Sequence, residues 1–574
     1  MQKYTIEKFF AGKFFIIPTY QRDYAWETEN IEDLFEDIFE SIESGTSHYL
    51  GTFILSEIED NKYYIVDGQQ RLTTISLIIL AVIENLATET EKIIAKDKYV
   101  YSETEKRFRL SLLGKNSKIF QSIIDKTEVK PDNKSQRLLL SGYKYICERI
   151  TAIVKLKGKD GLLEFFKVLQ NLDVMEFVEK DQGKAIRIFQ TVNDRGKSLT
   201  NLEKAKSLLI YYSNRFLGGK LDDKVNEQFG HIFDAYNLIK TLAEDFKFNV
   251  INQKNFTEDF ILRYHYLSYR SENFEYRATV DYVLDVFLKN DLKSKKLDPS
   301  EMERFITSYS TDLMNFFINF HSLLEKASKI PQYFKLFAVL EISANLFPIT
   351  VKLHELGLLD QTLPKHKQST FLDLIEAVDV RVYKTYRSSA EKNIFTIANY
   401  SSVNTPEIIA NELINFMNGY QNDAAFKESL ENRSYDNSAI KHIFVEYDKA
   451  LQKKEFTINE LMKINSLQPT LEHVYSQSES ITFPSRGFES EEEYGIMTYK
   501  FGNYLLLEKS INSSIQDKSP DQKVYEGHYD KSIFKAANNL SAQIKTNDNK
   551  FDKKDLLARN SEIIEFILKR FSVL

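Results

Sequence analysis

Residues 63–83 predict a buried strand, a tight polar turn and a long apolar helix in direct succession. Residues 63–66 are aromatic and β-branched, which is typical of a strand. The apolar positions that follow recur at helical spacing, namely Leu72, Ile75, Ile78, Ile79, Val82 and Ile83. Asp67 and Gly68 therefore lie at a strand-to-helix turn. Free backbone N–H groups and the positive end of the helix dipole meet at such a turn and stabilise an anion.

The polar residues of this turn favour a cradle for a nucleotide phosphate. Arg71 would make a bidentate phosphate contact, and Gln69 and Gln70 would donate or accept hydrogen bonds. Asp67 would hold a metal ion or a ribose hydroxyl. A second interpretation stays open, in which Asp67 only caps the helix and Arg71 is a solvated charge.

The chain is too long for one hydrophobic core. Its 574 residues predict about two to four domains. Apolar residues make up 43% and aromatic residues 13%, which is enough for several cores and excludes a disordered chain. The low counts of 10 Pro and 19 Gly favour helices joined by short loops. We therefore expect an α+β fold that is predominantly helical.

A single cysteine, Cys147, excludes a disulfide framework and a cysteine-based zinc site. The N-terminus lacks the apolar core of a signal peptide, and residues 75–83, the strongest apolar run, are too few to span a bilayer. We expect a soluble cytoplasmic protein with no membrane partner. The net charge of -7 is not that of a bulk polyanion binder, although a local patch would still bind nucleic acid.

An aromatic and polar loop over residues 18–26 precedes the next helix. Tyr20, Tyr24 and Trp26, the only tryptophan, are the candidates for an aromatic wall. These rings would either stack on a base or close the domain core.

A similar polar stretch over residues 187–200 breaks one helix and starts another. Asn193, Arg195 and Lys204 would form a second wall of the anion site. A simple turn at this place needs only Gly196 and a helix cap.

The pattern changes along the second half of the chain. Residues 216–465 show long helical patterns without a catalytic signature, and the histidines there lack metal-ligand spacing. Residues 470–477 and 500–507 then predict two strands, and a polar segment follows at residues 511–514.

These two strands carry residues suited to metal-assisted phosphodiester cleavage. His473 would take a proton from the attacking water. Glu472 and Asn512 offer hard oxygen ligands for Mg²⁺ or Mn²⁺. Asn503 would brace the loop that carries His473 through hydrogen bonds to the backbone. Lys523 would contact phosphate or be an ordinary solvated charge, and a structural role for His473 stays open.

In this order the motifs resemble the GmrSD family of modification-dependent restriction proteins, including its phosphorothioate-sensing SspE relatives. The N-terminal block is similar to the family's ParB-like nucleotide-binding domain, and the matching residues are 17–22, 49–51, 67–74 and 189–196. The resemblance implies that nucleotide binding or hydrolysis uses Gln21, Arg22, Asp67, Gln70 and Arg71.

The C-terminal block resembles the family's HNH nuclease domain, which has a ββα-metal fold. Its three motifs match residues 471–477, residues 501–507, and residues 511–513 with Lys523 and Tyr525. The resemblance implies that His473 is the general base and Asn512 a metal-side residue. In one departure, Ser476 stands where the family commonly has proline, which would loosen the turn but remove no ligand.

The resemblance implies an anti-phage restriction endonuclease with three domains. These are a ParB-like sensor at residues 1–215, a helical scaffold or recognition region at 216–465 and an HNH domain at 466–574. The protein would recognise modified phage double-stranded DNA, hydrolyse a nucleoside triphosphate, and nick or cut the DNA with Mg²⁺ or Mn²⁺. GTP, CTP, UTP and ATP are not distinguished. A homodimer or a partner subunit of a restriction-modification system is a further expectation.

Two rival functions stay open. One is a nucleotide-dependent DNA-binding or regulatory module that does not cleave DNA, which the departure at Ser476 favours. The other is a toxin-like nuclease that acts on the host's own nucleic acid.

Overall fold

The predicted strand, turn and helix are present as β4 Lys62–Asp67 and α3 Gln69–Glu84. The computed structural model describes residues 2–17, 23–112, 114, 116–180, 200–271, 274–432, 438–477, 481–515 and 517–572. In α3, fourteen of the sixteen residues are buried. This helix packs against α4 Glu89–Tyr99 and α6 Lys134–Asn171. Because α3 is apolar around most of its circumference, it forms the centre of the N-terminal core.

The chain forms two compact units. The first comprises Met1–Thr241 and Val280–Ile318, and the second comprises Leu242–Thr279 and Asn319–Leu574. Two of the three breaks in this division fall within the helices α9 Asp222–Asp245 and α13 Pro299–Ala327, and the third falls between Thr279 and Val280.

A mixed six-stranded sheet organises the first unit. Its strand order is β1-β8-β3-β4-β2-β7. Strand β2 is parallel to β4 and β7, and β3 is parallel to β8, whereas β3 pairs with β4 and β1 with β8 in the antiparallel sense. The strands other than β4 are β1 Gln2–Thr5, β2 Phe14–Ile17, β3 Tyr49–Glu59, β7 Leu110–Leu112 and β8 Asp173–Glu179. Because β2 and β4 are parallel, their carboxyl ends lie at the same edge of the sheet.

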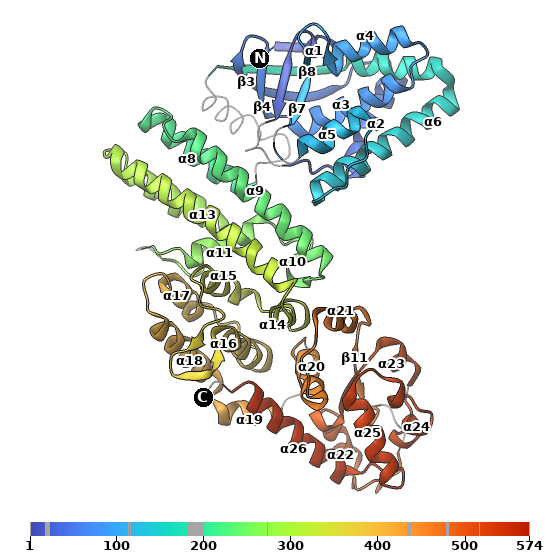
Figure 1. Cartoon of the computed structure of the whole chain (residues 1–574), viewed down its shortest axis with the longest axis vertical. Helices are drawn as coiled ribbons and strands as arrows, with labels where there is room; N and C mark the ends of the chain where they lie inside the picture. The colour runs from blue at the N-terminus through green and yellow to red at the C-terminus, as the bar shows by residue number, and fades with distance from the viewer. Residues whose placement is uncertain are drawn as a thin grey trace. The chain divides into compact units, whose positions relative to one another are not determined.

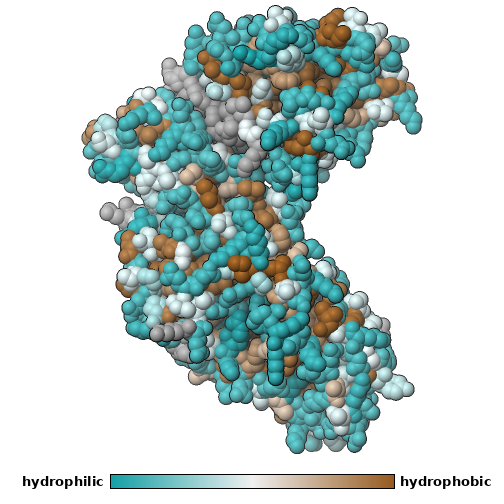
Figure 2. Space-filling view, in the orientation of Figure 1, coloured by the Kyte–Doolittle hydropathy of each residue, from teal (hydrophilic) through white to brown (hydrophobic). Residues whose placement is uncertain are grey.

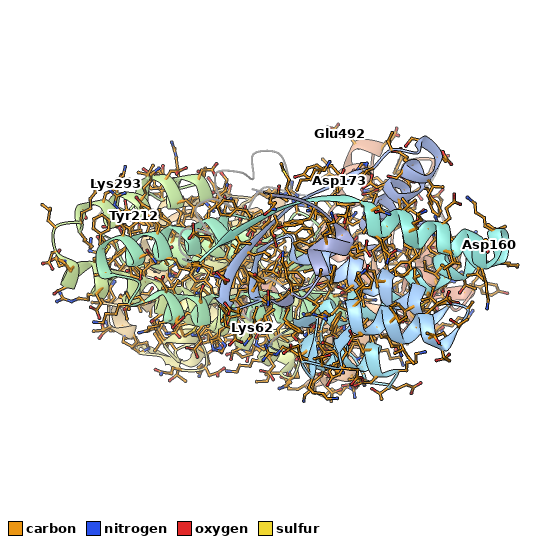
Figure 3. The ribbon with its side chains drawn as sticks, turned by 90° about the horizontal axis from the view of Figure 1, so that it is seen from above. Lys62, Asp160, Asp173, Tyr212, Lys293 and Glu492 are labelled. Atoms are coloured by element: carbon orange, nitrogen blue, oxygen red, sulfur yellow. The ribbon has the colours of Figure 1, made fainter. Side chains whose placement is uncertain are left out.

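Helices pack around this sheet, and α6 contacts four of them (Figure 1). The helices of this region besides α3, α4 and α6 are α1 Ile6–Phe10, α2 Thr28–Ser44 and α5 Asn116–Asp125. A small hairpin of β5 Tyr101–Ser102 and β6 Arg107–Phe108 follows α4. Helix α6 breaks at Gly158, which has φ 68° and ψ -168°. Asp160, just beyond the break, marks the bend of α6 in Figure 3.

The remaining elements are nearly all helical. In the first unit these are α8 Asn201–Leu217, the π-helix η2 Tyr282–Leu288 and α12 Lys289–Ser294. The helical part of the second unit contains α10 Asn249–Asn252, α11 Glu258–Ser268, α14 Pro331–Phe334, η3 Lys335–Val339, η4 Ala344–Leu346, α15 Phe347–Glu355, β9 Thr362–Leu363, β10 His366–Thr370, α16 Phe371–Val378, η5 Asp379–Thr385, α17 Lys392–Tyr400, α18 Pro406–Gln421, α19 Asp423–Asn432, α20 Ser438–Gln452 and α21 Ile458–Ser466.

A β-β-α succession begins at β11 Thr470–His473. This strand pairs with β12 Tyr504–Leu507 in the antiparallel sense, and α23 Lys509–Ile515 follows β12. The other elements of this region are α22 Glu491–Met497, η6 Phe501–Asn503, α24 Pro520–Tyr525, η7 Tyr529–Lys531, α25 Lys535–Thr546 and α26 Lys553–Arg570.

Both strands are shorter than the sequence predicts. The first ends at His473 because the carbonyl groups of His473 and Val474 both accept hydrogen bonds from Lys523 Nζ, at 2.7 and 3.0 Å. Successive carbonyl groups of a strand point to opposite edges, so the chain must bend here. Before the second strand, η6 forms a 3₁₀ turn in which Gly502 lies directly against the backbone of α26.

The predicted fold class, α+β and predominantly helical, is confirmed. Within the described ranges, no helix is both long enough and apolar enough to cross a membrane. The face seen in Figure 2 is mostly hydrophilic, with apolar side chains scattered over it. The division into domains at 1–215, 216–465 and 466–574 stays a prediction.

Replacing Gly502 by alanine is expected to destabilise the C-terminal region. The added Cβ would lie 2.2 Å from the Leu556 carbonyl oxygen and 2.8 Å from the Asn560 nitrogen. Overpacking against a rigid backbone costs about 1–3 kcal/mol. The measurement is the urea unfolding midpoint by circular dichroism, with Gly495→Ala as the control because a Cβ there meets nothing within 4 Å. Equal midpoints for the two variants would contradict the packing described.

Candidate functional site

Glu472 and His473 are the last two residues of β11, which pairs with β12. In this register Glu472 is opposite Leu505 and His473 is opposite Tyr504. Neighbouring residues of a strand point to opposite faces. Glu472 and His473 are therefore adjacent in sequence, but their side chains have different surroundings.

His473 has the surroundings of a neutral base. Its ring packs edge-on against Tyr504 at a centroid distance of 5.1 Å, and its Nε2 lies 3.3 Å from Gln477 Nε2. Burial lowers the pKa of His473, and the positive charge of Lys523 lowers it further. A histidine with a lowered pKa is neutral at neutral pH and can accept a proton.

Asn503 braces the chain directly after His473. Its Oδ1 accepts a hydrogen bond from the Tyr475 N–H at 2.7 Å, and its Nδ2 donates to the carbonyl groups of Tyr475 and Thr498 at 3.0 and 2.9 Å. The backbone carbonyl of Asn503 also accepts from the Val474 N–H. These contacts are the bracing that the sequence predicts. Because the side chain is fully buried, it is not accessible to a substrate.

Asn512 lies on α23 beside β11. Its Nδ2 donates to Thr470 Oγ1 at 2.8 Å and to the Leu471 carbonyl at 3.0 Å. The amide nitrogen is therefore committed to the strand, and the amide oxygen is the atom suited to bind a metal ion.

Glu472 does not have the surroundings expected of a metal ligand. Its carboxylate is buried, and Oε1 accepts hydrogen bonds from Lys523 Nζ at 2.8 Å and Tyr529 Oη at 3.2 Å. Burial raises the pKa of Glu472, and Lys523 opposes this rise. In the part of the chain that the structure describes, no group of three or more His, Cys, Asp or Glu side chains could hold a metal ion. The geometry is that of a structural ion pair.

Two residues of this site were not recognised from the sequence in these roles. Lys523 is almost fully buried, although the sequence suggests a phosphate contact or a solvated charge. Arg559 is also buried and donates to the carbonyl groups of Gly502 and Tyr504 at 2.6 and 2.7 Å. The sequence does contain an indication that Arg559 is buried, because this residue lies within the apolar stripe of α26, one turn after the buried Leu556.

The predicted phosphate turn begins α3 with a glycine in the left-handed conformation. Gly68 is the N-cap residue of α3 and has φ 91°, so Asp67 is not the N-cap residue. A Cβ at Gly68 would lie 2.4 Å from Phe53 Cδ1. Both the positive φ and this contact require glycine at the turn.

Arg71 is packed against the protein and is not a freely solvated charge. Its guanidinium lies 5.6 Å from the centre of the Phe53 ring, and Nη1 is 3.4 Å from the Thr52 carbonyl oxygen. A Cβ at Gly51 would approach the guanidinium to 2.5 Å. Burial lowers the pKa of Arg71, and the charge of Asp67 acts in the opposite direction. Asp67 and Arg71 thus lie near enough at the turn for their charges to influence each other.

The polar side chains of α3 anchor the loop that precedes α2. Gln70 accepts a hydrogen bond from the Ala25 N–H at 2.8 Å and donates to the Asp23 carbonyl at 3.0 Å. Tyr24 is buried and its hydroxyl lies 2.8 Å from Thr74 Oγ1. Tyr24 therefore belongs to the core rather than to an open aromatic wall. Both the oxygen and the nitrogen of the Gln70 side-chain amide form hydrogen bonds with the loop.

Trp26 is partly buried against the same core, and Gln69 is buried at the start of α3. Gln21, Arg22, Asn193 and Arg195, also predicted for the nucleotide site, lie outside the described part of the chain. Tyr20 also lies outside it. Lys204 lies on α8, where its Nζ donates to Asn201 Oδ1 at 3.1 Å. The structure thus brings Asp67, Gly68, Gln69, Gln70 and Arg71 together at one turn.

Removing the Asn503 side chain is expected to free the chain after His473. Because Asn503 Oδ1 holds the Tyr475 N–H, Asn503→Ala leaves that buried donor unsatisfied, at a cost of about 1–3 kcal/mol. Hydrogen–deuterium exchange should become faster over residues 473–477. Asn512→Ala is the control, since Asn512 contacts Thr470 and Leu471 instead. Unchanged exchange in Asn503→Ala would refute the brace.

Two family models match the chain. The model described as the GmrSD restriction endonuclease N-terminal domain matches residues 6–210, which include the turn at Asp67. The model described as the GmrSD restriction endonucleases C-terminal domain matches residues 420–566, which include β11, β12 and α23. A search of the curated proteins found no match. The two models together cover more than half of the sequence, in the order that the motifs predict, and the chain belongs to the GmrSD family of restriction endonucleases.

Proposed function

We propose that this restriction endonuclease cuts modified phage DNA at an HNH-type site built around His473, and that a nucleoside triphosphate bound at the turn after β4 controls the cutting. The family supports the nuclease role. The observation that carries the finer proposal is the half-buried His473, whose carbonyl accepts a hydrogen bond from Lys523, while Asn503 holds the backbone of Tyr475 two residues later.

The proposed reaction is hydrolysis of a phosphodiester. The neutral imidazole of His473 takes a proton from a water molecule, the water oxygen forms a bond to phosphorus, and the bond from phosphorus to the 3′ oxygen breaks. The leaving 3′ oxygen takes up a proton from solvent. The low pKa of His473 favours its unprotonated form, which is the form this step needs.

A metal requirement is part of the proposal, although the residues fit it only in part. Mg²⁺ or Mn²⁺ would supply charge stabilisation for the scissile phosphate. The amide oxygen of Asn512 suits such an ion, because its nitrogen is already bonded to β11. The carboxylate of Glu472 does not fit, since Lys523 and Tyr529 occupy it.

The residue that departs from the family pattern does not weaken the proposal. Ser476 stands at the expected proline, and its hydroxyl donates to Asp517 Oδ1 at 3.1 Å. Its carbonyl accepts from the Tyr494 hydroxyl at 2.7 Å. Hydrogen bonds therefore hold the turn that proline would otherwise stiffen, which supports an ordered turn after His473.

The nucleotide would bind where Asp67, Gly68 and Arg71 meet at the start of α3. The helix N-terminus and the guanidinium favour phosphate, and Asp67 suits a metal ion or a ribose hydroxyl. GTP, CTP, UTP and ATP all carry the groups required. Binding there would favour one arrangement of the protein, in which cutting of modified DNA is allowed. A homodimer or a second subunit is compatible with this control.

His473→Ala is expected to abolish nicking of modified plasmid in Mg²⁺ or Mn²⁺. Loss of a general base lowers the rate by roughly 10²- to 10⁴-fold. Nicking is measured by gel electrophoresis, and nucleotide hydrolysis by the same preparation should persist. The control is His231→Ala, an exposed histidine on α9. Cleavage by His473→Ala at the wild-type rate would remove the nuclease assignment.

Asp67→Ala is expected to remove nucleotide turnover and protection of cells from phage, because the charge that would hold the metal ion or ribose is lost. Phosphate release and plaque counts are the measurements. Lys96→Ala changes an exposed charge on α4 and is the matched control. Arg71→Ala should act in the same direction, with a melting temperature recorded because Arg71 also packs on Phe53. Full turnover and full protection in Asp67→Ala would mean that the turn is only structural.

A further inference from the structure

The ammonium group of Lys523 is the most completely enclosed cation near His473. Its side chain is 1% exposed. Nζ donates to Glu472 Oε1 at 2.8 Å, to the His473 carbonyl at 2.7 Å and to the Val474 carbonyl at 3.0 Å. An ammonium has three protons to donate, and these three acceptors match them.

The two carbonyl contacts fix the backbone at the base itself. Strand β12 holds one edge of β11. Lys523 reaches from α24 to the carbonyl groups at the end of β11, where the chain bends away from strand geometry. The side chain of Asn503 forms hydrogen bonds with both the N–H and the carbonyl group of Tyr475. The direction of the His473 side chain thus depends on both Lys523 and Asn503.

The carboxylate of Glu472 completes the surroundings of Lys523. A buried cation is stable only with a charged or strongly polar partner. Glu472 supplies the charge, and Tyr529, which is fully buried, donates to the same oxygen of Glu472 at 3.2 Å. Both residues therefore lie in an enclosed cluster on the side of the strand away from the Tyr504 ring that His473 contacts.

We propose that Lys523 is a positioning residue for His473, and that Glu472 acts as the counter-ion of Lys523 and not as a metal ligand. This inference rests on the proposed nuclease function. It assigns Lys523 a role within the protein interior, where it would not contact DNA phosphate. It also separates the two members of the Glu472-His473 pair, because only His473 would take part in the reaction.

The first test measures cleavage rates for Lys523→Met. Because a displacement of about 1 Å in a reacting group can cost roughly 10²-fold in rate, kcat is expected to fall by about that factor while KM for DNA stays within about threefold. Lys523→Arg, which keeps the charge and the donors, should recover part of the loss. Lys545→Met removes a lysine from an exposed ion pair with Asp530 in the same region, and it should leave kcat unchanged.

The second test separates a counter-ion from a metal ligand. Glu472→Gln keeps an oxygen that accepts from Lys523 and removes the charge that a metal ion would need. If Glu472 is a counter-ion, the Mg²⁺ concentration for half-maximal cleavage stays at the wild-type value while kcat falls. If Glu472 binds the metal, that concentration rises, by at least the roughly 10- to 100-fold seen for changes around metal ligands.

These arms have distinct outcomes. Wild-type kcat in Lys523→Met, or a large shift in the Mg²⁺ requirement of Glu472→Gln, would overturn the inference and leave the nuclease intact. Should Lys523→Met fail to fold, as judged by its melting temperature, the kcat of Lys523→Arg and the Mg²⁺ titration of Glu472→Gln test the inference instead. A wild-type protein that cuts no modified DNA in either metal would overturn the nuclease function, and with it this inference.

Discussion

The buried ion pair between Lys523 and Glu472 is the contact on which the geometry of the candidate nuclease site depends. A lysine taken out of water is costly unless its charge and its donors are all satisfied. Here the carboxylate of Glu472 satisfies the charge, and two backbone carbonyl groups beside the candidate base satisfy the remaining donors. The same contacts therefore stabilise the buried lysine and end the strand at His473.

Helix α26 contacts both the candidate nuclease site and the helical part of the second unit. Near its start, Arg559 holds the turn that carries Asn503. Roughly three helical turns later, Arg570 donates to Glu376 and Glu446, at 2.8 Å in each case. Burial alone would raise the pKa of Glu376, but Arg570 and His442 bring it down to about 2. Helix α26 therefore makes buried contacts both with the turn at Asn503 and with the helices that carry Glu376 and Glu446.

Sequence patterns predicted the parts of this protein that depend on local chemistry. The apolar run after Asp67 is long enough to define α3, and Gly68 marks its start because no other residue suits the backbone there. Asn503 was predicted to brace its loop, since asparagine beside a strand end commonly bonds to backbone. The two boundaries between the three predicted domains, and the roles of Gln21, Arg22, Asn193 and Arg195, remain predictions.

Other features depend on contacts between distant segments, and the sequence did not reveal them. The alternation of a strand shows that Glu472 and His473 face opposite ways, but it does not show which face is covered. The residues that cover the Glu472 face are Lys523 and Tyr529. They lie on helical segments too short to show a helical periodicity in the sequence. The end of β11 at His473 has the same origin, because the bend depends on a lysine 50 residues away.

We propose that one chain couples nucleotide binding to the cutting of modified DNA. The most direct measurement is cleavage of matched modified and unmodified phage DNA by the purified protein in Mg²⁺ or Mn²⁺, with and without each nucleoside triphosphate. Coupling predicts cutting of modified DNA alone, at a rate that changes when the correct nucleotide is added. Equal cutting of both DNAs, or no cutting in any combination, would contradict it.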